Sequence, residues 1–233
     1  MPRTRPPERF NQLVTSAIKV FTTRGYRRTQ MADVARDMGV SPGTLYNYVE
    51  SKEALFHLLI ERAFRTDQAA RPARLPVPTP PPEATLTRLR ERLAAAARFP
   101  QLDAALARQR VTNARAELDG VVRELYSLVA GNRQASALIE RSALDRPELA
   151  AVWFGELRRG ILERLTRYLE HRIERGHFRP VPDAPTAARL ILEVIAWFAW
   201  HRHEDPFSRM DDKLAEETAV HFVVSALGRE EGS

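Results

Sequence analysis

The sequence contains no cysteine among its 233 residues. This absence excludes a disulfide framework, a zinc site with thiolate ligands, a cysteine nucleophile and a sensor based on thiol oxidation. Any signal to which the protein responds must therefore act through a chemistry other than that of sulfur.

Long hydrophobic runs are also missing. A membrane-spanning helix needs roughly 18–20 consecutive apolar residues, whereas the most apolar stretch, Leu190–Trp200, is shorter and is interrupted by Glu193. The basic N-terminal stretch leads into an amphipathic segment rather than into the apolar core of a signal peptide. We therefore expect a cytoplasmic protein that has no membrane partner.

Common catalytic motifs are absent as well. The sequence has no HExxH zinc motif, no glycine-rich phosphate loop and no GxSxG nucleophile elbow. His201 and His203 are two positions apart, so on a helix they point to different faces and converge poorly on a metal ion. We predict no catalytic residue, no metal site and no cofactor.

The charge of the chain is concentrated near its beginning. Residues 1–65 hold 11 lysines and arginines against 6 acidic residues, a balance of +5, while the whole chain carries +6. A local excess of this kind favours a partner rich in phosphate. From charge alone, an ordinary solvated surface is an equally good explanation.

The sequence predicts an all-α protein. Apolar residues recur at helical spacing, glycine and proline separate the segments, and no run alternates with the period of two that a strand requires. We expect helices from after Pro7 to before Gly25 and from Ser51 onward, and over Thr29–Met38, Ser41–Tyr48, Glu83–Phe99, Leu102–Val129, Pro147–Arg175, Thr186–His203 and Asp211–Leu227.

A proline-rich stretch marks the best domain boundary. Six prolines lie between Arg71 and Pro82, where they cannot continue a helix and favour extended backbone. The expected domains are a helix-turn-helix DNA-binding domain at residues 1–50, a connecting helix and linker at 51–82, and a C-terminal helical domain at 83–228.

Residues 29–48 have the pattern of a helix-turn-helix, in which two helices are joined by a tight turn, here at Gly39. Leu45 and Val49 lie four residues apart and are expected to face back onto the preceding helices. The positions then expected to point outward are Gly43, Tyr46 and Asn47, with Thr44 and Tyr48 on the flanks.

The outward residue types suit DNA. The hydroxyls of Ser41, Thr44 and the two tyrosines can donate to phosphate oxygens, and Gly43 permits a close approach to a groove. Asn47 can present a donor and an acceptor to an adenine edge. Lys52 lies at the start of the next helix, where the helix dipole disfavours a cation, and a nearby phosphate would explain it.

One dense motif covers about a quarter of the chain. It consists of Gly25-Tyr26, Thr29-Gln30-Met31, Val34-Ala35, Gly39-Val40-Ser41-Pro42-Gly43-Thr44-Leu45-Tyr46, Tyr48, Ser51-Lys52-Glu53 and Leu55. This motif resembles the N-terminal signature of the TetR/AcrR family of transcriptional regulators. It departs from that signature at Met38 and Val49, where the family usually has Ala and Phe. Both residues are apolar and expected to face inward, so they alter packing rather than the DNA-facing surface.

The resemblance implies a homodimer whose first three helices bind a double-stranded DNA operator and whose variable helical domain binds a small molecule, of unknown identity, and forms the dimer. It implies phosphate contacts by Thr29, Thr44, Tyr46, Tyr48 and Lys52. It places Ser41, Pro42, Gly43 and Asn47 in or at the major groove. The basic arm with Arg3 and Arg5 would either add DNA contacts or remain a mobile tail.

The resemblance also places a dimer interface on the last two helices. The final helix has an apolar face rich in small residues: Ala215, Ala219, Phe222, Val223, Ala226 and Leu227. Small residues allow close approach of a partner helix, and the alternative is that this face packs within its own subunit.

Several aromatic side chains are candidates for a ligand cavity, although residues of this type at helical spacing also form cores. The candidates are Tyr126, Trp153, Phe154 and Trp197. Glu193 is acidic within the most apolar run. Its favoured interpretation is an ion pair with Arg189 on a solvated helix face, and its alternative is a buried carboxylate that recognises a cationic ligand.

The leading functional interpretation is a repressor that a small molecule releases from a palindromic operator, and not an enzyme. One alternative is an all-α enzyme acting on a hydrophobic substrate, for which the sequence offers no convergent acid-base or metal groups. Another is a peripheral membrane protein, which the lysine-poor polar face of the first helix disfavours.

Overall fold

The computed structural model describes residues 7–64 and 72–229. The chain divides into two compact units, of which the first contains residues 1–96 and 134–156 and the second contains residues 97–133 and 157–233. This division does not follow the domain boundaries expected at residues 50 and 82, which stay a prediction. The basic arm with Arg3 and Arg5 lies outside the described residues.

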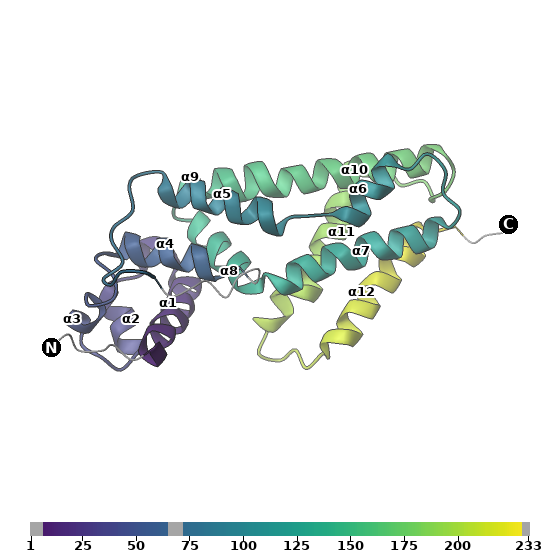
Figure 1. The fold of residues 1–233 in the computed structure, drawn as a ribbon. Coiled ribbons are helices and arrows are strands. Elements are labelled where there is room, and N and C mark those ends of the chain that lie inside the picture. Colours follow the sequence, from purple (N-terminus) through teal and green to yellow (C-terminus); the bar gives the residue numbers. More distant parts are fainter. Residues whose placement is uncertain (1–6, 65–71, 230–233) are drawn as a thin grey trace. The chain divides into compact units, whose positions relative to one another are not determined.

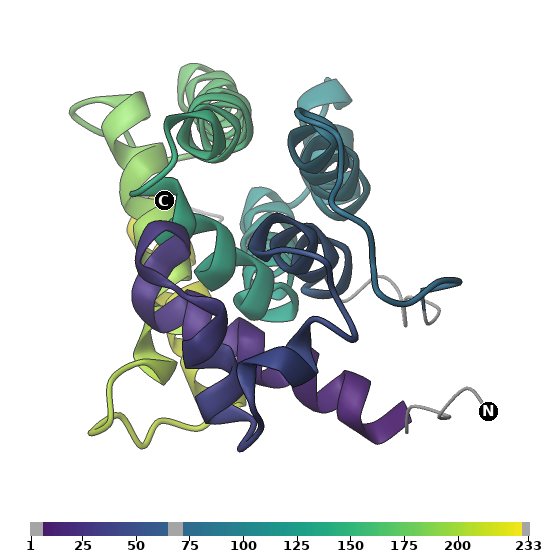
Figure 2. The same cartoon turned by 90° about the vertical axis from the view of Figure 1, so that its left-hand side faces the viewer.

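The first unit contains the helix-turn-helix. Its helices are α1 (Pro7–Arg28), α2 (Met31–Asp37), α3 (Pro42–Leu45), α4 (Lys52–Arg62), α5 (Ala84–Ala96), α8 (Arg133–Ala143), α9 (Pro147–Ala150) and the π-helical η1 (Ala151–Arg158), of which α8 and η1 cross a unit boundary at one end. Helix α1 packs against α2 and α4, α2 packs against α3, and α4 packs against α5. Figures 1 and 2 show this arrangement in purple and blue.

Two glycines with a left-handed backbone shape the first helices where the sequence predicts breaks. Gly25 interrupts α1 with φ 78° and ψ 174°, and a Cβ added there would lie 2.5 Å from Oδ2 of Asp145. Gly39 follows α2 with φ 67°. Glycine adopts such angles without the steric cost that a Cβ imposes, so these residues allow the sharp changes of direction on either side of α2.

An apolar and aromatic core lies beneath α3. Phe10, Phe21 and Phe56 are almost fully buried, and the ring centroids of Phe21 and Phe56 are 5.5 Å apart. Leu45 and Val49 are 0% exposed, which confirms that they face back onto the preceding helices. Because burying such a side chain contributes about 1.5–3 kcal/mol, this core determines which face of α3 remains outside.

The second unit contains α6 (Pro100–Ala107), α7 (Ala114–Gly131), α10 (Arg159–Glu174), α11 (Ala184–Ala199), the 3₁₀ turn η2 (His201–His203) and α12 (Asp212–Leu227). Helix α11 packs against α7, α10 and α12 around an apolar core. Arg172 is fully buried in this unit. Its Nε donates to Glu117 Oε1 at 2.7 Å and its Nη2 to the carbonyl of Ala105 at 2.6 Å, so the buried cation has the partners that its desolvation requires.

The all-α prediction is confirmed: residues 7–64 and 72–229 form helices and two isolated β-bridges but no strand. The helix expected over Leu102–Val129 is two helices instead, because Asn113 caps α7 by accepting from the amide of Ala116 at 2.7 Å. Helix α8 lies where no helix was expected. Its buried residues Ala135, Leu138, Ile139 and Ala143 follow helical spacing, so the sequence did carry an amphipathic pattern that the prediction missed.

Candidate nucleic-acid interface

Helix α3 and the turn that follows it carry a polar surface. The exposed residues are Ser41, Pro42, Gly43, Tyr46 and Asn47, and Thr44 is half-buried. The outward positions predicted for Gly43, Tyr46 and Asn47 are therefore confirmed. The helix is shorter than expected, since it ends at Leu45. Hydrogen-bonded turns continue it, with the amide of Asn47 donating to the carbonyl of Thr44 at 3.3 Å.

The start of α3 is small and unobstructed. Ser41 is the N-cap residue, but its Oγ lies 3.0 Å from Oγ1 of Thr44 and makes no capping hydrogen bond with the backbone. Pro42 occupies the first turn. A Cβ added at Gly43 would have Ser41 Oγ, 4.0 Å away, as its nearest neighbour. A flat surface such as a groove wall could therefore approach this helix start closely.

Tyr48 does not lie on the flank where it was expected. It is 4% exposed, and its ring centroid lies 6.4 Å from that of Phe10. The physical reason is that the turns after α3 are closed by bonds between residues three apart, such as that from the amide of Tyr48 to the carbonyl of Leu45 at 2.8 Å, which brings Tyr48 onto the same buried side as Leu45. Its predicted contact with phosphate stays a prediction, and it would require the side chain to leave this packing.

Thr29, with which the helix expected over Thr29–Met38 begins, does not cap α2, which starts at Met31. The N-cap residue is Gln30, whose backbone amide donates to Asp33 Oδ2 at 3.0 Å as part of a capping box. Thr29 is 1% exposed, and its Oγ1 donates to the carbonyl of Gly25 at 2.7 Å. The hydroxyl of Thr29 is therefore already bonded to the carbonyl oxygen at Gly25, where α1 is interrupted. A phosphate contact by Thr29 stays a prediction.

Lys52 begins α4, next to the polar surface of α3. Its Nζ donates to the carbonyl of Arg27 at 3.2 Å and lies 4.5 Å from the centroid of the Tyr26 ring. Partial burial lowers the pKa of Lys52, against the opposing effect of Glu53. An anionic partner would favour the charged form, so the site suits a phosphate better than it suits solvent alone.

Tyr26 links Lys52 to the rest of the first unit. Burial, followed by its hydrogen bond to Glu53, raises the pKa of Tyr26 to about 12, and Oη donates to Glu53 Oε1 at 2.9 Å. The guanidinium carbon of Arg146 lies 4.5 Å from the centroid of the same ring. Asp145 accepts from the amide of Arg27 at 3.1 Å. These contacts fix the backbone whose carbonyl holds Lys52.

Sequence reasoning missed a segment that contacts the connection between α3 and α4. We call residues 72–82 the proline-rich strap. The amide of Val77 donates to the carbonyl of Tyr48 at 2.8 Å, and the carbonyl of Val77 accepts from the amide of Glu50 at 3.0 Å. The proline content predicts that this segment is extended. Nothing in the sequence near Val77 indicates that it pairs with residues almost thirty positions earlier.

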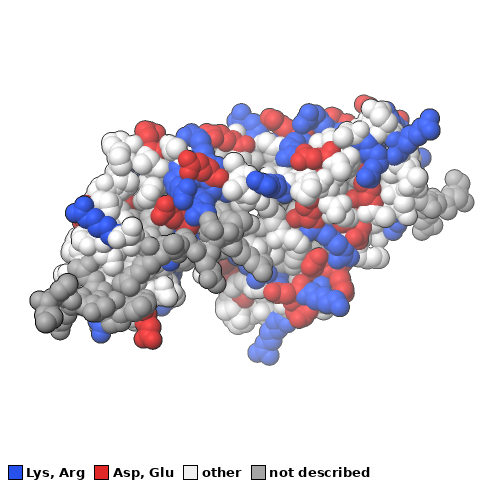
Figure 3. All heavy atoms as spheres, viewed as in Figure 1, with Lys and Arg blue, Asp and Glu red and all other residues white. Residues whose placement is uncertain are grey.

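Charges of both signs are interspersed on the face of the protein drawn in Figure 3. Within the first unit, Lys19 pairs with Asp37 at 2.6 Å and Arg24 pairs with Asp33 at 3.0 Å. Exposed pairs of this kind contribute little to stability. They nevertheless neutralise Lys19 and Arg24 locally, so Lys52 and the exposed residues of α3 and its following turn are stronger evidence for DNA binding than the net charge is.

The candidate ligand residues are divided between the two units. In the first, Trp153 is half-buried and donates from Nε1 to Glu140 at 3.2 Å, while Phe154 is 37% exposed. In the second, Tyr126 is buried and donates from Oη to the carbonyl of Phe198 at 3.2 Å. Trp197 is 43% exposed. Their role in ligand binding stays a prediction.

Glu193 belongs to a solvated ion-pair cluster. Its side chain is 42% exposed, its Oε1 lies 2.6 Å from Nε of Arg189, and it also pairs with Arg158. Of the two interpretations, the ion pair with Arg189 is the one present in the structure. A carboxylate with this much solvent and two cationic partners is a weak candidate for recognising a cationic ligand.

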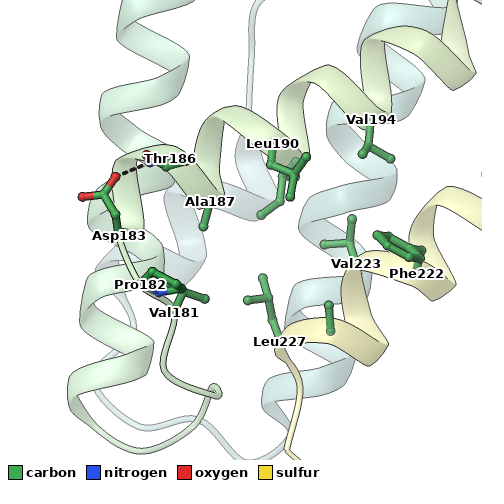
Figure 4. Close-up of a pocket in the computed structure, with 12 residues that line it drawn as sticks. Val181, Pro182, Asp183, Thr186, Ala187, Leu190, Val194, Phe222, Val223 and Leu227 are labelled. Atoms are coloured by element: carbon green, nitrogen blue, oxygen red, sulfur yellow. Dashed lines mark hydrogen bonds between the residues drawn. The ribbon is translucent and has the colours of Figure 1, made fainter.

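The candidate dimer face of α12 is split by the fold of the second unit. Ala215, Ala219 and Val223 are buried against their own subunit, whereas Phe222 is 62% exposed and Ala226 is exposed. Phe222 and Ala226 border an apolar groove of about 470 Å³ between α11 and α12, shown in Figure 4. Its other apolar side chains include Leu190, Ile191, Val194 and Leu227.

Within residues 7–64 and 72–229, the structure has no helix that is both long and apolar enough to cross a membrane.

Comparisons with known proteins agree with this geometry. Residues 13–59 match the model of the family described as bacterial regulatory proteins, tetR family. The chain is 30% identical over 76 residues to the HTH-type transcriptional regulator HbdR of Aromatoleum sp. (strain CIB), a match that covers 33% of each protein. The first curated relatives are thus matched over only about a quarter to a third of their length.

Solved structures resemble the chain over nearly its whole length. The ketosteroid transcriptional regulator KstR2 of Mycobacterium tuberculosis is 17% identical with a TM-score of 0.59, and the alignment covers 97% of this chain and 98% of that one. AibR, in complex with isovaleryl coenzyme A and operator DNA, is 17% identical with a TM-score of 0.52, over 92% and 97% of the two chains. At these identities the likeness shows a shared fold.

Proposed function

We propose that this chain, which belongs to the tetR family of bacterial regulatory proteins, is a transcriptional repressor that a small molecule releases from a palindromic DNA operator. The single observation that carries the proposal is the surface of α3. The short helix and the turn that follows it expose Gly43, Tyr46 and Asn47, while the buried residues Leu45 and Val49 anchor them from behind. Membership of a family of regulators also removes the support for the enzyme alternative.

The proposed division of roles follows exposure. Ser41, Pro42, Gly43 and Asn47 would lie at the major groove, where Asn47 reads a base edge. The phosphate contacts would come from Thr44, Tyr46 and Lys52, which set the position of the protein rather than its sequence preference. Thr29 and Tyr48 are buried in the free protein, so the phosphate contacts proposed for them would require their side chains to move on binding.

We propose a homodimer as the DNA-binding form. Two copies would place their α3 helices in successive major grooves, about 34–36 Å apart, which requires an inverted repeat in the operator. The apolar groove between α11 and α12 supports this proposal, because Leu190 and Phe222 are 60% and 62% exposed beside it. Exposed apolar surface of this kind is typical of protein interfaces.

The proposed effector is a small molecule bound by the helices that follow α4, and the proposed location is the cytoplasm, where the DNA is. The complex of AibR with isovaleryl coenzyme A and operator DNA supports a regulator with both kinds of partner. Tyr126, Trp153, Phe154 and Trp197 remain the proposed ligand contacts, and Glu193, which pairs with Arg189, is the weakest of the candidates. Preferential binding of an effector to the DNA-free state by about 1–3 kcal/mol would suffice to release the operator.

The test is a selection of binding sites from random-sequence duplex DNA by the purified protein, followed by equilibrium titrations. We expect enrichment of an inverted repeat, and a dissociation constant for it at least about a thousandfold below that for scrambled DNA. Recovery of sequences without a shared repeat, or equal affinity for selected and scrambled duplexes, would contradict the proposal.

A further inference from the structure

The connection between α3 and α4 is short and not helical. It runs from Tyr46 to Ser51, so it contains the DNA-facing residues Tyr46 and Asn47 and ends next to Lys52. Helix α3 has four residues, which is one turn, and such a helix has little stability of its own. The position of Asn47 relative to Lys52 therefore depends on what holds this connection.

The proline-rich strap holds it through four hydrogen bonds. Two are the backbone bonds of Val77, which form an isolated parallel bridge between Val49 and Val77. The other two come from Thr79, whose amide donates to Glu50 Oε2 at 3.0 Å and whose Oγ1 donates to Ser51 Oγ at 2.9 Å.

The bond between Thr79 and Ser51 reaches the start of α4. Ser51 Oγ is the N-cap acceptor for the amide of Ala54 at 3.0 Å. The Thr79 hydroxyl donates to this same oxygen, so the strap orients the capping group of the helix that begins with Lys52. A cap of this type stabilises the start of a helix, and a second donor fixes its direction.

The composition of the strap suits this role. Prolines occupy positions 76, 78, 80, 81 and 82, on both sides of Val77 and Thr79. Proline restricts φ and so reduces the number of conformations that the segment loses when it is fixed against the connection. The strap can therefore order the connection at a lower entropy cost than a flexible linker of the same length.

From these contacts we infer that the proline-rich strap, through Val77 and Thr79, is a positioning element of the DNA-binding surface that sets operator discrimination. This inference rests on the proposed function. When the strap is in place, Tyr46, Asn47 and Lys52 already have the mutual arrangement that an operator requires. When it is detached, a fraction of molecules lacks that arrangement, and the apparent operator affinity falls in proportion.

Non-specific DNA provides the readout that separates positioning from a general loss of structure. Non-specific binding depends on phosphate contacts, which tolerate small changes of orientation. Reading of a base edge by Asn47 does not tolerate them. Loss of the strap should therefore weaken binding to the operator and leave binding to scrambled DNA almost unchanged.

The experiment compares variants on the duplex that the unmodified protein selects from random-sequence DNA, with a scrambled duplex as reference. Thr79→Val removes the hydroxyl and keeps the volume, and Thr79→Ser restores the donor. A second variant replaces residues 76–80 with Gly-Ser-Gly-Ser-Gly. The matched control is Thr85→Val, which removes the contact of Thr85 Oγ1 with His57 Nδ1 at 3.1 Å, elsewhere in the first unit.

We expect Thr79→Val to raise the dissociation constant for the selected duplex by a factor of roughly two to ten, the range for one intramolecular hydrogen bond. The Gly-Ser replacement should raise it by about tenfold or more. Thr79→Ser and Thr85→Val should bind as the unmodified protein does, and all variants should bind scrambled DNA alike.

Two results would overturn the inference. One is an unchanged preference for the selected duplex in both Thr79→Val and the Gly-Ser variant, or in Thr79→Val alone if the replacement does not fold. The other is an equal loss of affinity for selected and scrambled DNA. If the unmodified protein itself selects no duplex, the proposed function fails first, which is a distinct outcome visible before any variant is made.

Discussion

Helices α3 and α12 both bury an apolar face, but their exposed faces differ. Each buries one face in its own unit, through Leu45 in α3 and through Ala219 and Val223 in α12. On the other face, α3 and the turn that follows it expose Gly43 and Asn47, while α12 exposes Phe222. The buried faces of both helices are apolar, so they do not indicate which partner each helix binds.

The exposed faces are what distinguishes the two helices. A polar surface with hydroxyls, an amide and a helix start suits an anionic partner that offers hydrogen-bond acceptors. An exposed phenylalanine beside an apolar groove suits a partner that removes it from water. The proposed function therefore assigns DNA to α3 and a second copy of the chain to α12, and each assignment can be broken by a substitution that leaves the buried face untouched.

The largest effect is expected from Phe222→Glu. In a symmetric dimer each substitution acts twice, and losing the burial of one phenylalanine costs about 1.5–3 kcal/mol. We expect the dimer dissociation constant to rise at least about a hundredfold, with unchanged helix content because the side chain is exposed in the single chain. Analytical ultracentrifugation measures this constant. Lys213→Glu, nine residues and therefore about two and a half turns away on α12, is the control, and equal dissociation of both variants would contradict the assignment.

The next effect concerns discrimination by α3. Asn47→Ala removes a side chain that is exposed in the free protein, so stability should not change. We expect the preference for the selected operator over one with a changed base pair to fall by about 1–3 kcal/mol at a single position of each half-site. Competition titrations with singly substituted duplexes measure it. A uniform loss of affinity across all duplexes would assign Asn47 to phosphate instead.

Gly43→Ala tests how closely α3 approaches its partner. A Cβ at this position meets nothing nearer than 4.0 Å in the free protein, and alanine favours a helix. Thermal stability should therefore stay equal or rise, while operator affinity falls roughly tenfold because the methyl group meets the groove. Gly160→Ala on α10 is the matched control, since a Cβ there also has open space. Unchanged operator affinity in Gly43→Ala would show that α3 does not approach closely.

The smallest effect is expected from Lys52→Ala. Lys52 would contact phosphate, so its loss should weaken binding to every duplex by a similar factor of a few and reduce the slope of log K against log salt by about 0.9. Titrations at several salt concentrations measure the slope. Lys213→Ala on α12 is the control for a change of one charge. A changed sequence preference without a changed slope would contradict the phosphate role.

Local rules explain what could be predicted from the sequence. The breaks at Gly25 and Gly39 require a positive φ, and Ser51 caps α4 through a bond to the amide of Ala54. Each of these features depends on residues within a few positions. The outward direction of Gly43 and Asn47 followed from the same kind of local reasoning, because Leu45 and Val49 fix the register of α3.

The features that escaped prediction depend on distant partners. Thr29 has the residue type of an N-cap, but its hydroxyl donates to the carbonyl of Gly25 instead. Tyr48 was expected on a flank, and it packs on Phe10 instead. The strap at Val77 pairs with a connection almost thirty residues earlier, and no pattern of residue types near Val77 identifies that partner.

The most direct test of the central claim, that α3 enters DNA, is protection of guanine N7 from methylation in the selected duplex. N7 lies in the major groove, where it is read by side chains and shielded by an inserted helix. We predict two protected patches, centred about 10 base pairs apart, that fade in the Asn47→Ala and Gly43→Ala proteins. Operator binding that leaves every guanine N7 reactive would contradict the account.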